Sequence, residues 1–190
     1  MSQNFEINAH ESTEPVSKYA IAIRYGLMTG FLSMFLTTIN FLYLLKISYV
    51  AFLVGGFLMF AVPIFFYWIA ATRQRAILGG YITLKDAFQV IFIVVLISLT
   101  ISTIYGLIYN KYIDPDFITR MKESMQSFFE KMKMPEDKMD EALANVDSAT
   151  ASATKPSKLF YSLAQGIIFQ SIFGFIIALL AKKERVHTPQ

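Results

Sequence analysis

Four long uncharged runs constrain this chain more than any other feature of its sequence. Tyr25–Leu45 contains 21 residues without a charge, and 47–72, 87–110 and 159–181 contribute 26, 24 and 23 more. A helix needs about 20 apolar residues to cross the hydrocarbon core of a bilayer. Hydrophobic residues also make up 55% of the 190 residues, which is more apolar surface than a soluble domain of this size can bury. The sequence therefore predicts an all-α membrane protein with four transmembrane helices.

The boundaries of these helices follow from short polar interruptions. We expect the first three helices at about 20–45, 47–72 and 87–109, and the fourth at 159–181. The first two are separated by a turn at Lys46 and Ser48, because one uninterrupted helix would be far too long for a membrane. Gly79-Gly80 ends the second helix, and Thr83 with Asp86 three residues later predicts a capping box that opens the third. Residues 1–18 are expected to be a flexible cytoplasmic tail, and residues 182–190 a second cytoplasmic tail.

The basic residues near the helix ends predict the orientation. Eight of them would share one side: Lys18, Arg24, Arg73, Arg75, Lys85, Lys182, Lys183 and Arg185. The opposite side has four in comparable positions: Lys46, Lys111, Lys155 and Lys158. An excess of Lys and Arg marks the cytoplasmic side. Both termini are therefore expected in the cytoplasm, and the hydrophilic segment 110–158 is expected to be extracytoplasmic.

Segment 110–158 is the only long hydrophilic insertion between the apolar runs, and it contains an amphipathic helix. Asp114-Pro115 predicts the start of this helix, with the aspartate as its cap. Large apolar residues then recur at steps of three and four, which indicates one apolar helix face: Phe117, Ile118, Met121, Met125, Phe128, Phe129 and Met132. Pro135 is expected to restart a second helix with a weaker apolar stripe, and 147–156 to form a flexible return.

Exposing seven large apolar side chains would forgo about 1.5–3 kcal/mol each, so something must cover this face. The second helix of the insertion, a copy of the same protein, another membrane protein and the bilayer surface are the alternatives. The insertion carries 8 basic and 9 acidic residues without a polybasic patch, which disfavours strong electrostatic binding to lipid. We identify the seven residues as a candidate association face.

No catalytic, cofactor or metal site is predicted. The chain has no cysteine, and its two histidines, His10 and His187, both lie in the tails. Met121 and Met125 stand one helical turn apart and could hold Cu(I), but adaptable packing of an apolar face is the simpler explanation. Without a basic stripe interleaved with aromatic residues, nucleic acid is not an expected partner.

Three polar residues interrupt the apolar runs, and they support an alternative function. Asn40, Gln165 and Gln170 could bond between helices or line the path of a small oligomeric transporter or channel. A third alternative, an enzyme acting on a lipid-linked substrate, would need acidic residues, or Arg24 and Tyr112, to converge at the bilayer surface.

The order of these features resembles a bacterial family of small four-span inner-membrane proteins known only as a domain of unknown function. The residues that carry the resemblance are Gly79-Gly80-Tyr81-Ile82-Thr83 with Asp86-Ala87-Phe88, and Tyr105, Tyr109 and Tyr112-Ile113-Asp114-Pro115. The resemblance covers about 24–183 and implies a Gram-negative envelope protein; it supplies no reaction, cofactor or active residue that could be transferred to this chain.

The sequence therefore predicts a multi-pass inner-membrane protein that is not an enzyme. We expect it to be an accessory protein or subunit that acts by association through its outer amphipathic helix. The expected partners are the lipid bilayer and either further copies of the chain or another membrane protein.

Overall fold

The computed structural model describes residues 18–153 and 156–183, and these form long helices and one isolated β-bridge. In chain order the elements are α1 (Lys18–Ile39), η1 (Asn40–Leu44), α2 (Leu45–Ile47), α3 (Tyr49–Ile77), α4 (Leu84–Ile108), η2 (Tyr109–Ile113), α5 (Phe117–Lys131), α6 (Glu136–Ala153) and α7 (Pro156–Ala181). The elements η1 and η2 are single π-helical turns that continue α1 and α4. Apart from Lys18, Lys182 and Lys183, the two expected tails lie outside the described residues.

Four of these helical stretches are long and apolar enough to cross a membrane. They comprise 19–47, 49–77, 84–113 and 157–181. The predicted all-α fold, with four such helices and a helical insertion between the third and the fourth, is confirmed. Each stretch extends a few residues beyond its uncharged run, because Lys and Arg side chains near a helix end can reach the membrane surface while their backbone stays helical.

The boundaries between helices follow local chemistry. Ser48 is extended and its hydroxyl accepts a hydrogen bond from the backbone N–H of Ala51 at 3.0 Å, which caps α3 at the predicted turn. Gly79 and Gly80 both have positive φ, at 75° and 90°, in the turn after α3. Thr83 then caps α4 by accepting from the N–H of Asp86 at 3.1 Å, and its hydroxyl donates to the Asp86 carboxylate at 2.8 Å.

The four long helices pack through small residues. Gly26 and Gly30 of α1 lie against Ile97 and Ile101 of α4, so close that an added Cβ would meet these side chains within 3 Å. Gly174 of α7 lies equally close to Ile91 of α4. Small residues let helix backbones approach in lipid, where no hydrophobic effect drives the helices together. Both α3 and α4 contact all three of the other long helices, and the most extensive contacts are those of α4 with α1 and α7.

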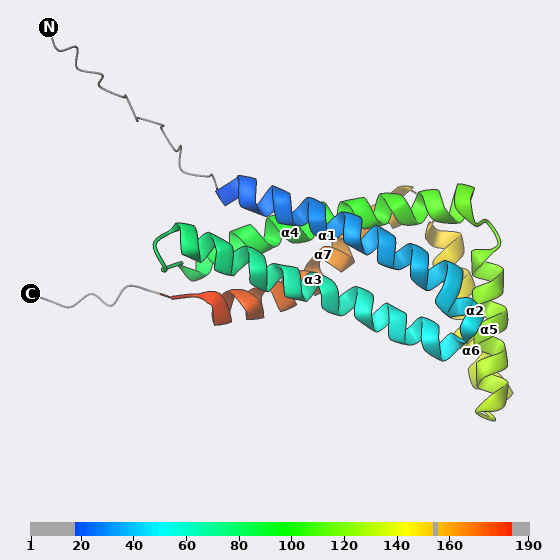
Figure 1. Cartoon of the computed structure of the whole chain (residues 1–190). Helices are drawn as coiled ribbons and strands as arrows, with labels where there is room; N and C mark the ends of the chain where they lie inside the picture. Colours follow the sequence, from blue (N-terminus) through cyan, green and yellow to red (C-terminus); the bar gives the residue numbers. More distant parts are fainter. Residues whose placement is uncertain (1–17, 154–155, 184–190) are drawn as a thin grey trace, which may run out of the picture.

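The described ends of the chain lie at the same end of the bundle (Figure 1). Ile82 and Lys183 exchange two backbone hydrogen bonds of 3.0 Å, which join the α3–α4 turn to the end of α7. Arg75 also donates a hydrogen bond to the backbone carbonyl of Ala181 at 3.1 Å. At the opposite end of the bundle lies the insertion.

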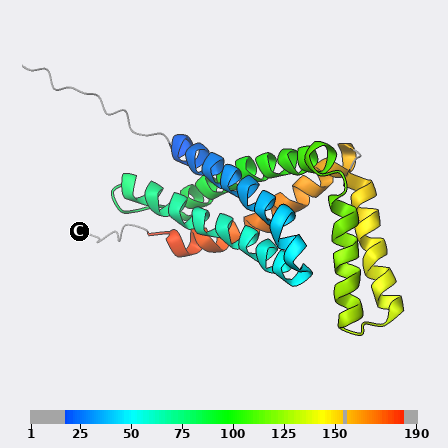
Figure 2. The same cartoon turned by 45° about the vertical axis from the view of Figure 1, so that its right-hand side comes forward.

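The insertion is a helical hairpin in which α5 and α6 run side by side across the end of the bundle (Figure 2). Lys133, with φ 53°, lies in the turn between them, and Lys122 of α5 pairs with Asp147 of α6 at 2.5 Å. Two details differ from expectation. Asp114 does not cap α5, which begins only at Phe117. Segment 147–153 belongs to α6 rather than to a flexible return, because alanine-rich sequence readily continues a helix; residues 154–155 lie outside the described part.

Candidate functional site at the base of the hairpin

An aromatic cluster joins the hairpin to the bundle. Phe117, at the start of α5, stacks on Phe41 of η1 with 4.0 Å between the ring centroids. Tyr109 of η2 meets both rings edge-on, at 5.1 Å from Phe41 and 5.9 Å from Phe117. Phe52 of α3 completes the contact with Phe117 at 6.3 Å. Aromatic pairs in these geometries add about 0.5–1.5 kcal/mol each beyond the area that they bury, so this cluster fixes where the hairpin begins.

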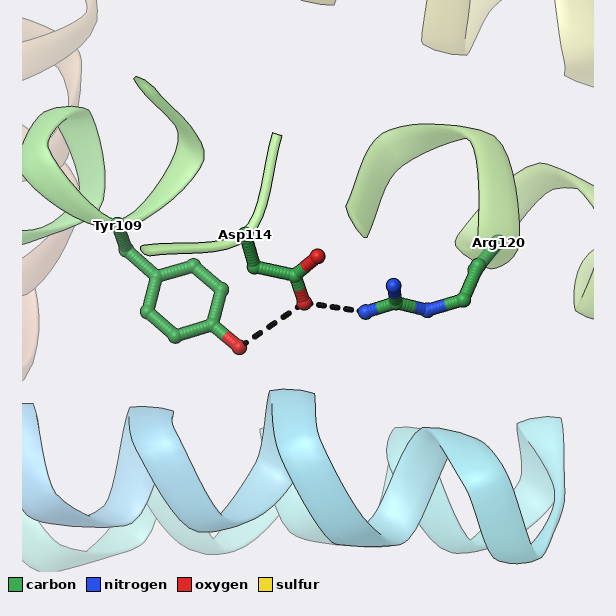
Figure 3. Close-up of polar contacts among 3 residues, drawn as sticks. All are labelled: Tyr109, Asp114 and Arg120. Atoms are coloured by element: carbon green, nitrogen blue, oxygen red, sulfur yellow. Dashed lines mark hydrogen bonds and ion pairs between the residues drawn. The ribbon is translucent and has the colours of Figure 1, made fainter. Parts of the chain in front are cut away.

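A buried carboxylate lies beside this cluster. Asp114 is only 8% exposed, and its Oδ2 accepts hydrogen bonds from the hydroxyl of Tyr109 at 3.3 Å and from Nη2 of Arg120 (Figure 3). The hydrogen bond to Asp114 is the main cause of a raised pKa of Arg120, so the guanidinium stays charged. A buried carboxylate is stable only when paired and hydrogen-bonded. The three side chains therefore link η2 to the first turn of α5.

Both π-helical turns lie at this junction. Phe41 comes from η1 and Tyr109 from η2, and both are in the same apolar cluster as Leu45 and Phe117. Just below, the hydroxyl groups of Thr38 and Tyr105 share a hydrogen bond between α1 and α4. A π-helical turn inserts one residue and rotates the next part of the helix, and such turns often occur at functional sites. Here they turn aromatic side chains toward the hairpin.

The seven residues of the candidate association face lie mostly against their own chain. Phe117 and Met125 are buried, and Ile118, Met121, Phe128 and Phe129 are partly buried. Tyr49 of α3 covers Phe128 and Phe129, with ring centroids 5.4 and 6.4 Å away. Met132, at the tip of the hairpin, remains 58% exposed. The bundle end formed by η1 and the start of α3 supplies much of this cover, which none of the sequence-based alternatives included.

The residues of this junction that the sequence analysis did not single out are Tyr109, as a partner of Asp114, and Arg120. Asp114 was expected to cap α5. One signal was present in the sequence: Arg120 follows Asp114 by six residues across a helix start. Aromatic residues also flank the turn at Ser48, on the side of the bundle where the insertion lies.

The three polar residues of the apolar runs lie apart from one another. Asn40 is buried and donates to Sδ of Met59 at 3.6 Å. Gln170 accepts a hydrogen bond from the hydroxyl of Tyr67, between α7 and α3. Gln165 is exposed on α7, where it bonds within its own helix to Tyr161 at 3.2 Å. They therefore do not line one path.

Arg24 and Tyr112 do not converge at one place, as an enzyme acting on a lipid-linked substrate would require. Arg24 is exposed in the first turns of α1, while Tyr112, 71% exposed, lies in η2 at the opposite end of the bundle. Within residues 18–153 and 156–183, no group of three or more His, Asp or Glu side chains is placed to share a metal ion.

Comparison with known proteins gives one match. The family model described as "Protein of unknown function (DUF4199)" matches residues 24–183, which include nearly all of the four long helices and the whole hairpin. The predicted resemblance to a small multi-pass membrane family of unknown function is thereby confirmed. No curated protein and no solved structure matches the chain.

Proposed function

The chain belongs to this family of unknown function, and we propose that it is a non-enzymatic subunit or accessory protein of an envelope complex that acts by association through the α5–α6 hairpin. One observation carries the proposal: the hairpin is anchored to the bundle along the apolar face of α5, which leaves the outer side of α6 exposed. A polar arm held in a fixed direction by a partly buried ion pair is suited to present a surface to another protein.

The exposed side of α6 is negatively charged. Its acidic residues are Glu136, Asp137, Asp140 and Glu141, against the single basic residue Lys138, which pairs with Glu141 at 3.4 Å; Asp147 instead pairs with Lys122 of α5. The apolar residues of α6, such as Leu143 and Val146, are partly buried. An acidic surface is repelled by anionic lipid headgroups and attracted to basic protein surfaces. The proposed partner therefore presents a basic surface to α6.

The expected orientation is part of this proposal. Arg73, Arg75, Lys85, Lys182 and Lys183 gather at the bundle end opposite the hairpin, because the Ile82–Lys183 bridge joins their segments. An excess of basic residues close to the spans favours the cytoplasmic side. We infer that both termini are cytoplasmic, and that the hairpin projects from the outer face of the inner membrane.

Cysteine labelling tests the orientation without background, because the chain has no native cysteine. Ser148→Cys, on the exposed side of α6, is expected to react with a membrane-impermeant maleimide in intact spheroplasts. Lys85→Cys, at the other end of the bundle, should react only after the membrane is opened. If only Lys85→Cys were labelled in intact spheroplasts, the protein would have the opposite orientation.

Site-specific crosslinking tests the association. A photoreactive residue at Asp140, which is exposed on α6, is expected to form an adduct with one distinct protein in native membranes, whereas the same residue at the buried Met125 should form none. Because the attraction is electrostatic, the paired substitution of Asp137→Lys with Glu141→Lys should remove the adduct. An adduct that survives this charge reversal, or equal adducts from Asp140 and Met125, would contradict the proposal.

A further inference from the structure

A stripe of exposed side chains runs the length of α7 on the outside of the bundle. Its members recur at alternating steps of four and three residues, the spacing of a helix–helix seam with a seven-residue repeat: Tyr161, Gln165, Ile168, Ile172, Phe175 and Leu179. Five of these side chains are apolar or aromatic and are compatible with contact to lipid. Gln165 is not, and it makes this stripe different from an ordinary lipid-facing surface.

Gln165 lies well inside the apolar part of the membrane. At 1.5 Å per residue it is about 12 Å from Ser157, where the candidate span begins, and about 24 Å from Ala181, where it ends. A hydrocarbon core about 30 Å thick, centred on this helix, therefore contains Gln165 with several ångströms to spare. An amide side chain exposed at this depth has no water to bond to, so it gains from a partner on another helix.

The hydrogen bond that Gln165 makes within its own helix leaves capacity for such a partner. Its Nε2 donates to the hydroxyl of Tyr161 at 3.2 Å, which uses one of its two amide N–H bonds. Gln170, by contrast, points into the bundle and accepts a hydrogen bond from Tyr67. The two glutamines of α7 thus face different surroundings. Gln170 faces the interior of the bundle, and Gln165 lies on its outer surface.

Shallow depressions border the stripe on both sides. One, of about 510 Å³, is lined by residues of α7 alone: Gln165, Gly166, Ile168, Phe169 and Ile172. The other, of about 530 Å³, lies between α7 and α4, and the same Ile168 and Ile172 form one of its walls. These two isoleucines are therefore a ridge between two hollows. Helices pack by placing the ridge of one beside the ridge of the other, so this surface has the relief that receives a second helix.

From these observations we propose that two copies of the chain pair through α7, with the Gln165 amides hydrogen-bonded to each other across a two-fold axis. All copies insert in the same direction, so two α7 helices meet in parallel with their Gln165 residues at the same depth. An amide both donates and accepts hydrogen bonds, so it can bond to its own copy, as a two-fold interface requires. A different partner would need its own polar residue at this depth.

Disulfide crosslinking of the purified full chain in lipid nanodiscs tests the pairing. Ile172→Cys, in the seam, is expected to form a disulfide-linked species of twice the 21.6 kDa mass on mild oxidation. Phe57→Cys, on α3 and 70% exposed, is the control at the same ratio of protein to lipid and should remain monomeric. Equal crosslinking of both variants would indicate random collision and would overturn the proposal.

Gln165→Leu separates the hydrogen bond from the apolar contact. Leucine is favoured in lipid, so this variant should fold and insert as the parent does, which its thermal melting in detergent checks. The association constant of its dimer is expected to fall by about 3- to 30-fold, the range for the loss of one hydrogen bond between helices in a membrane. Unchanged dimerisation would overturn the role of the amide. A monomeric parent, or an Ile172→Cys adduct with another protein found only in native membranes, would overturn the pairing itself.

Discussion

Arg120→Leu is expected to lower the free energy of unfolding of the detergent-solubilised protein by about 2–3 kcal/mol. The substitution leaves the carboxylate of Asp114 buried without a charged partner, and the hydroxyl of Tyr109 alone cannot replace it. Loss of one member of a fully buried ion pair costs about 3–5 kcal/mol; the Arg120 side chain is 38% exposed, so we expect less. Denaturant titration followed by circular dichroism measures the change.

The comparison variants separate this ion pair from a general effect of charge. Lys131→Leu, at the exposed end of the same helix, should change stability by about 0.5 kcal/mol or less. Adding Asp114→Asn to Arg120→Leu removes both charges and should recover much of the loss, because a neutral amide is cheaper to bury. Hydrogen exchange in α5 should accelerate in Arg120→Leu before exchange in α4 does. If Arg120→Leu and Lys131→Leu proved equally stable, the ion pair would not hold the hairpin.

Gly55→Ala is expected to cost about 1–3 kcal/mol, the usual penalty for forcing an extra methyl group into a packed site. The new Cβ would lie 2.1 Å from Oδ1 of Asn40 and 2.5 Å from Cδ1 of Leu44. Asn40 is buried and bonded to Met59, so it cannot swing away without giving up that contact. The thermal midpoint in detergent should therefore fall, and the α1–α3 contact below the hairpin should loosen.

The adjacent glycine supplies a matched control. Gly56 is in the same turn of α3, but a Cβ there would meet nothing within 4 Å. Gly56→Ala should therefore be neutral or slightly stabilising, because alanine favours the helix by about 1 kcal/mol over glycine. Combining Gly55→Ala with Asn40→Ala removes the closest collision and should recover part of the loss. Equal melting of Gly55→Ala and Gly56→Ala would show that the close approach of Asn40 does not matter.

The apolar stripe of α5 packs against the end of the bundle, and the sequence alone could not predict this contact. Periodicity indicates that Phe117 and Phe128 must be covered, but it carries no information about the covering surface. The cover comes from Phe41, Tyr49 and Phe52, which are far away in the sequence. Sequence reasoning therefore identified a face that needs cover and omitted the end of the bundle from the surfaces that could cover it.

The sequence by itself determined the number and type of the long helices, because these are local properties. A run of 20 uncharged apolar residues can satisfy its backbone hydrogen bonds in lipid only as a helix. The cap at Thr83 and the amphipathic pattern of α5 are equally local, since each depends on residues within a few turns. The family resemblance likewise followed from residues that can be read along the chain.

Only the tertiary structure decided which side chains meet across helices. The pairing of Asp114 with Tyr109 and Arg120, the π-helical turns at η1 and η2, and the different surroundings of Gln165 and Gln170 all depend on how distant segments close on one another. The sequence pattern around a polar residue in an apolar run is the same whether its side chain faces a neighbouring helix or lipid. Its direction is set by the packing of the whole bundle, which no local pattern encodes.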